Sequence, residues 1–167
     1  KELRHLDPIG KHPRRPFVIL MGGAKIETKM PFIKHFLQNG GRVLLGGTLA
    51  NTVLKTRGVP IGKSRFEKSM LQQARRIAHH PRLILPMDAR ISVAPKKGTV
   101  IKPLERIGAT DTILDIGPET EKRFAQEIRR AKTVLWNGPL GLIEKKQFQQ
   151  GTLATARALK TSRAYVV

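Results

Sequence analysis

The chain has 167 residues, of which 40% are hydrophobic and 26% are charged, and it contains no cysteine. This composition is typical of a globular protein and excludes an intrinsically disordered chain, a disulfide framework and a thiolate metal site. With 32 Lys and Arg against 12 Asp and Glu, the formal net charge is +20, which attracts polyanions. No apolar run approaches the roughly 20 residues of a membrane-spanning helix, so we expect a soluble protein with no membrane partner.

The basic residues include five doublets that are spread along the chain. These are Arg14-Arg15, Arg75-Arg76, Lys96-Lys97, Arg129-Arg130 and Lys145-Lys146. With one Trp, one Tyr and six Phe, the sequence contains no evident base-stacking platform and no nucleic-acid-binding module. Because the doublets are dispersed, we expect polyanion binding, if any, to be non-specific.

The first segment, residues 1–15, is polar and contains two prolines and a glycine. We interpret it as a linker or helix end that enters a single domain covering residues 16–167. The chain begins with neither an initiator methionine nor a signal-like apolar core, so we expect a fragment of a longer protein.

Six short apolar segments alternate with helical patterns and predict the fold class. They are residues 17–21, 42–45, 82–85, 112–116, 132–136 and 163–167. Most are continuously apolar, which is typical of strands covered on both faces. The sequence therefore predicts a three-layer, Rossmann-like α/β domain with a parallel sheet of about six strands.

Three of the helices between these strands have recognisable ends. Residues 30–38 place apolar side chains on one face and stop at a glycine pair, Gly40-Gly41. Ser64 and Glu67 have the spacing of a capping box and predict a helix that begins there. Residues 118–130 carry acids in the first turn and bases in the last, which matches the helix dipole.

A glycine turn with two lysines follows the first predicted strand. Gly22, Gly23 and Ala24 precede Lys25, and Lys29 lies where the next helix is expected to begin. A cation there opposes the helix dipole by roughly 0.3–1 kcal/mol, so a bound anion such as phosphate best explains the pair. The motif is neither G-x-G-x-x-G nor a Walker loop, and an ordinary β–α turn with solvated lysines is the alternative.

Two further glycine turns follow predicted strands. Gly46-Gly47 precedes Thr48, and Asn137-Gly138-Pro139-Leu140 is followed by Glu144. Parallel sheets bind ligands at the carboxyl ends of their strands, where these turns are expected to lie.

In these blocks and their order, the chain resembles the C-terminal, nucleotide-binding domain of phosphoglycerate kinase over about residues 13–167. The matching blocks are 15–18 (RPFV), 22–25 (GGAK), 46–52 (GGTLANT), 62–64 (GKS), 114–118 (LDIGP), 136–139 (WNGP) and 151–152 (GT). The resemblance implies phosphoryl transfer between 1,3-bisphosphoglycerate and ADP in glycolysis. It also implies a cytoplasmic, monomeric enzyme that binds ADP or ATP with Mg²⁺.

The resemblance implies a role for each matching residue. Lys25 would contact nucleotide phosphate, and Lys29 would hold the phosphoryl group in transit. Leu114 would touch adenine and Glu144 the ribose hydroxyls. The remaining nucleotide-binding residues would be Gly22, Gly23, Ala24, Gly46, Gly47, Thr48, Asn137, Gly138, Pro139 and Leu140. The alternatives are that Asn137 caps its turn, Leu114 is core and Glu144 is solvated.

The chain departs from the family pattern at Thr48 and at its end. Thr48 stands where the family has a third glycine, so it is expected to weaken nucleotide binding. Val167 precedes the position of a Gly-Gly-Gly-Asp-Thr turn whose Asp helps to hold magnesium, so no metal ligand is expected in this chain. The partner N-terminal domain for 3-phosphoglycerate is also missing, and we expect no turnover by this chain alone. The competing interpretation is a non-catalytic descendant that its charge recruits to RNA or another polyanion.

Overall fold

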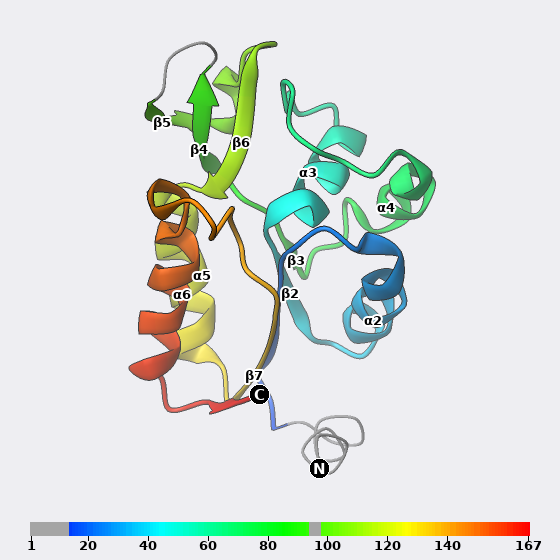
Figure 1. The fold of residues 1–167 in the computed structure, drawn as a ribbon. Coiled ribbons are helices and arrows are strands. Elements are labelled where there is room, and N and C mark those ends of the chain that lie inside the picture. The colour runs from blue at the N-terminus through cyan, green and yellow to red at the C-terminus, as the bar shows by residue number, and fades with distance from the viewer. Residues whose placement is uncertain (1–13, 94–97) are drawn as a thin grey trace.

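A computed structural model describes residues 14–93 and 98–167 of the chain (Figure 1). The predicted linker, apart from its last two residues, and the doublet Lys96-Lys97 lie outside the described residues.

The main sheet has five strands, all parallel, in the order β3-β2-β1-β7-β8. Their bounds are β1 Phe17–Met21, β2 Arg42–Leu45, β3 Leu83–Ile84, β7 Thr133–Asn137 and β8 Tyr165–Val166. The prediction of a parallel sheet of about six strands is therefore confirmed in its class, with one strand fewer.

The fourth predicted strand, residues 112–116, belongs to a second sheet, and its assignment to the parallel sheet was wrong. β6 (Asp111–Ile116) pairs antiparallel with β4 (Asp88–Val93), which pairs antiparallel with β5 (Thr99–Pro103). Neither β4 nor β5 was predicted, and β5 is largely exposed. Figure 1 shows this small sheet beyond the carboxyl ends of the main strands.

Helices cover both faces of the main sheet and confirm the three-layer architecture. On one side are α2 (Ile26–Gln38), α3 (Gly47–Thr56) and α4 (Leu71–Ile77), and on the other are α5 (Pro118–Arg130) and α6 (Gln150–Lys160) (Figure 1). The helix α6 was not predicted.

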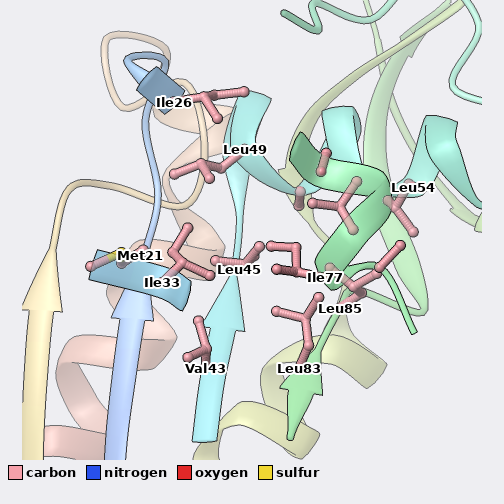
Figure 2. Close-up of a cluster of buried hydrophobic side chains, with 14 of the residues drawn as sticks. Met21, Ile26, Ile33, Val43, Leu45, Leu49, Leu54, Ile77, Leu83 and Leu85 are labelled. Carbon is pink, nitrogen blue, oxygen red and sulfur yellow. The ribbon is translucent and has the colours of Figure 1, made fainter. Parts of the chain in front are cut away.

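Each central strand sends alternate side chains into two hydrophobic cores. Ile19 of β1 and Val43 of β2 belong to the same buried cluster as Ile33 of α2. Figure 2 shows Val43 and Ile33 within this cluster. Leu20 and Leu44 pack on the opposite face with Phe124 of α5 and Leu159 of α6. Continuous burial of this kind explains why the central strands read as uninterrupted apolar runs.

Two predicted helix starts were wrong, whereas α5 begins and ends as predicted. The helix α2 begins at Ile26, so Lys29 lies one turn inside it. The 3₁₀ turn η1 (Lys68–Met70) and then α4 follow Glu67. Ser64 and Glu67 form no capping box, because both side chains bind residues that are distant in the sequence. The Ser64 hydroxyl accepts a hydrogen bond from the Ile113 amide at 2.7 Å, and the Glu67 carboxylate accepts one from the Ile26 amide at 3.3 Å.

Candidate functional site

The three predicted glycine turns meet at the carboxyl edge of the main sheet. The Gly22 amide donates to the Asn137 carbonyl at 3.0 Å, and the Gly46 amide donates to the Met21 carbonyl at 2.9 Å. A Cβ atom on Gly22 would lie 1.9 Å from the Pro139 oxygen. Glycine is therefore required at this position by the packing of the turns against one another.

The second turn packs as closely against the first. Gly47 has φ +59° and Gly23 has φ +87°, a region that favours glycine. A Cβ atom on Gly47 would lie 3.0 Å from the Gly23 nitrogen, and one on Gly46 would lie 2.6 Å from Leu140 Cδ2. These glycines allow backbone segments from β1, β2 and β7 to approach one another.

The two predicted catalytic lysines have different surroundings. Lys29 is half-buried, and its Nζ donates to the Gly22 carbonyl at 2.5 Å. A Cβ atom on Gly138 would lie 3.2 Å from the same Nζ, so the ammonium group sits between the first and third turns. Burial lowers the pKa of Lys29 from its ordinary value. Lys25 is exposed at the start of α2.

A carboxylate of the chain itself lies at the start of α2. Glu67 Oε2 accepts the amide of Ile26, the first residue of the helix. An anion near this helix end was expected from the two lysines, and Glu67 supplies one from 41 residues away.

A cavity of about 420 Å³ opens between the two sheets, within the size range of small-molecule sites. Eight of the predicted site residues line it: Gly23, Ala24, Gly47, Thr48, Leu114, Pro139, Leu140 and Glu144. The others, Gly22, Lys25, Lys29, Gly46, Asn137 and Gly138, do not line it. Of these, Gly22 and Gly46 are buried beneath the third turn.

Sequence reasoning missed the residues that α3 and its following loop bring to the cavity. Asn51 and Leu54 come from α3, and Arg65 comes from the loop after it. Asn51 is buried, and its Nδ2 donates to the Arg65 carbonyl at 3.1 Å, which fixes the loop against the helix. The block GKS at residues 62–64 lies in this loop, but its sequence did not indicate that the loop would line a cavity.

The small sheet supplies the opposite end of the cavity through β4 and β6. Asp115 is 1% exposed, and its carboxylate accepts the Gly151 amide at 2.8 Å and the Ile116 amide at 2.9 Å. The Leu142 amide donates to the Leu114 carbonyl at 2.8 Å, so β6 is also bonded to the segment after β7. Burial raises the pKa of Asp115 to about 6. This carboxyl group therefore joins β6 to the start of α6.

Trp136 is partly buried and packs against the core shared with α5 and α6. Its Nε1 donates to the Gly138 carbonyl at 2.8 Å, which also stabilises the third turn.

Neither a metal centre nor a membrane span is found among residues 14–93 and 98–167. Within these ranges, no group of three or more His, Cys, Asp or Glu side chains is placed to hold an ion. No helix in the same part of the chain has the length and apolar character needed to cross a bilayer.

A parallel sheet with glycine turns beside a cavity at its carboxyl edge defines an α/β protein of the kind that binds phosphorylated ligands there. The phosphoglycerate kinase family model matches residues 1–167, and the chain belongs to this family.

Similar proteins agree with this assignment. The phosphoglycerate kinases of Desulfosudis oleivorans and Rubrobacter xylanophilus are 38% and 39% identical to the chain, covering 100% and 98% of it. The chain spans 44% and 43% of their lengths. The solved phosphoglycerate kinase of Coxiella burnetii superposes with a TM-score of 0.91 at 32% identity, over 99% of this chain and 44% of that one. The enzyme from Pyrococcus horikoshii shares the fold, with a TM-score of 0.85 at 23% identity over 98% of this chain and 44% of that one.

Proposed function

We propose that this chain is the nucleotide-binding part of a phosphoglycerate kinase. The whole enzyme would transfer a phosphoryl group between 1,3-bisphosphoglycerate and ADP in glycolysis, in the cytoplasm and as a monomer. The observation that carries the proposal is the convergence of three glycine turns on one cavity, in a chain that belongs to this family.

The two ends of the cavity suit the two ends of a nucleotide. Gly23, Ala24, Gly47 and Thr48 line the end next to the start of α3, where the positive end of the helix dipole favours phosphate. Leu114 is half-buried in β6 and offers an apolar surface to adenine at the other end. Glu144 is exposed at the rim, where a carboxylate can accept hydrogen bonds from ribose hydroxyls.

The lysines supply charge to the transferred group. Phosphoryl transfer needs little covalent chemistry from the protein and depends on positioning and on cations near the developing charge. Lys29 would exchange its hydrogen bond with the Gly22 carbonyl for the oxygens of the phosphoryl group in transit. Lys25, which is exposed, would contact the phosphates of the bound nucleotide.

The other components would come from outside this chain. An N-terminal domain would bind 3-phosphoglycerate, which agrees with the 44% share of relatives that the chain spans. The nucleotide would carry Mg²⁺, but the described residues include no cluster fitted to hold the ion, so no step is assigned to a metal bound here. The competing interpretation, a non-catalytic descendant, has no support from the similar proteins, which are phosphoglycerate kinases.

The test uses the full-length enzyme in a coupled assay. Lys29→Ala is expected to lower kcat at least 100-fold with a smaller effect on the KM for ADP, because its charge matters most in the transition state. Lys25→Ala should impair both parameters. Lys34→Ala, on the same helix but bonded to Gln73, is the matched control and should retain activity. Wild-type kcat in the Lys29 variant would refute the assigned role.

A further inference from the structure

An exposed basic residue stands just before or at the start of each of the five parallel strands. In sheet order these residues are Arg82 before β3, Arg42 at the start of β2, Arg15 before β1, Lys132 before β7 and Arg163 before β8. Because the strands are parallel neighbours, the five residues lie along the amino edge of the sheet, and the glycine turns lie at the opposite edge. We call these five residues the amino-edge line.

The C-terminal turns of α5 and α6 add further positive charge at the same edge. The helices α5 and α6 lead into β7 and β8, so their last turns end beside the start of those strands (Figure 1). Arg129 and Arg130 end α5, and Lys160 ends α6; all three are exposed. Two of the doublets that are dispersed in the sequence, Arg14-Arg15 and Arg129-Arg130, thus lie at the same edge of the fold.

Little negative charge balances this edge. Glu127 pairs with Arg42 at 2.8 Å. The other ion pairs of the described residues involve Arg90, Lys102 and Lys122, which lie in the small sheet or the first half of α5.

Part of the amino-edge line has a structural role. Arg15 donates to the Asn39 carbonyl at 2.7 Å and Arg82 to the Leu37 carbonyl at 2.9 Å, where both satisfy the end of α2. The side chains of Lys132 and Arg163 form no hydrogen bond or ion pair within residues 14–93 and 98–167. The same holds there for Arg129, Arg130 and Lys160. Helix packing therefore accounts for only some of these cations.

We propose that the amino edge binds the phosphate backbone of double-stranded nucleic acid without regard to sequence. Neighbouring β-strands are about 4.8 Å apart, so the cations of five β-strands extend over roughly 19 Å. Along this length, each chain of a nucleic-acid duplex presents about six phosphates. Four of the five residues of the line are arginine, whose planar guanidinium group binds phosphate through two hydrogen bonds.

A duplex fits this edge better than a single strand. Single-strand binding needs several exposed aromatic rings on which bases stack, and Tyr165, 49% exposed, is the one such ring in the strands of the main sheet. The amino edge lies across the sheet from the cavity, so the proposal does not depend on nucleotide binding there.

The test is fluorescence anisotropy with a labelled 20-base-pair duplex across a salt series, using the purified full chain. We expect the logarithm of the association constant to fall linearly with the logarithm of the salt concentration. Lys132→Gln/Arg163→Gln should weaken binding at least tenfold at low salt and reduce the salt slope by about 2, because two phosphate contacts are lost. Arg129→Gln/Arg130→Gln should act similarly.

The matched control is Lys145→Gln/Lys146→Gln, which removes the same charge from an exposed doublet after β7, at the opposite edge. It should bind the duplex within twofold of wild type, and circular dichroism should show all three variants folded at the assay temperature. Equal losses in the control and the amino-edge variants would overturn the proposal. So would tighter binding of a single strand, or of anionic lipid vesicles, than of the duplex.

Discussion

The two sheets build the two ends of the cavity in different ways. The parallel sheet contributes backbone turns, held together by glycines at positions where any side chain would clash. The small antiparallel sheet contributes side chains, including Leu114 and Asp115, from strands that are partly exposed. The phosphate end of the proposed site is thus fixed by main-chain packing, whereas the base end can vary with the side chains of β4 and β6.

The largest expected difference between the two sheets is in stability. Phe124 is fully buried between α5 and the main sheet, and Phe124→Ala should lower the free energy of unfolding by about 3–5 kcal/mol. Ile101 of β5 is 52% exposed, and Ile101→Ala should cost less than about 1 kcal/mol. Urea unfolding measures both. Equal costs would contradict the view that the main sheet carries the core.

Gly22→Ala tests the packing of the turns directly. The added methyl group would meet the Pro139 oxygen, so we expect a loss of about 3 kcal/mol in the free energy of unfolding, from overpacking against main chain. The control is Gly58→Ala, which changes a glycine after α3 and adds a methyl group with nothing within 4 Å. Gly58 has φ +76°, so this control should cost only the strain of that conformation, about 1 kcal/mol. A smaller loss for Gly22→Ala than for the control would refute the packing argument.

These contrasts also show what the sequence can predict. The strands at 17–21 and 42–45 were located because both faces are buried, which leaves an uninterrupted apolar run. The strand β4 was missed although Ala89 and Ile91 alternate with polar residues, the pattern of a strand buried on one face. Ser64 and Glu67 matched a local motif, but long-range hydrogen bonds take both side chains.

The candidate site was predictable where its residues directly follow a strand in the sequence. The glycine turns have that property, and so their meeting follows from parallel topology. Asn51, Arg65 and Asp115 reach the cavity because the small sheet and a loop pack over the main sheet. The spacing of residues in the sequence does not predict this packing. The amino-edge line is similar: a basic residue at each strand start is visible in the sequence, but its alignment requires the strand order.

Asp115 tests the electrostatics of the base end. Burial raises the pKa of Asp115 from its ordinary value of 3.8 to about 6, so the buried carboxylate destabilises the folded state above pH 6. As the pH falls through 6, the folded state takes up the proton first and this penalty is relieved. Relative to Asp115→Asn, the wild type should gain about 2 kcal/mol of stability between pH 7 and pH 4.5. Chemical unfolding at both pH values measures this gain, and an unchanged difference would exclude a raised pKa.

Thr48→Gly tests the phosphate end with the smallest expected effect. Thr48 lines the cavity beside the first turn, and removing its side chain should strengthen ADP binding by about threefold, or somewhat under 1 kcal/mol. Calorimetric titration with ADP measures the change. Weaker binding by the variant would indicate that the threonine hydroxyl contacts the nucleotide and does not crowd it.

The central claim is that the turns of the parallel sheet and the strand β6 form one nucleotide site. Titration of the isotope-labelled chain with ADP at low salt, followed by amide chemical shifts, tests it most directly. We predict millimolar-range binding in which the amides of Gly23, Gly47 and Leu114 shift together along one binding curve, while that of Ile101 in β5 does not move. No shift with millimolar ADP, or shifts confined to the amino edge, would contradict the account.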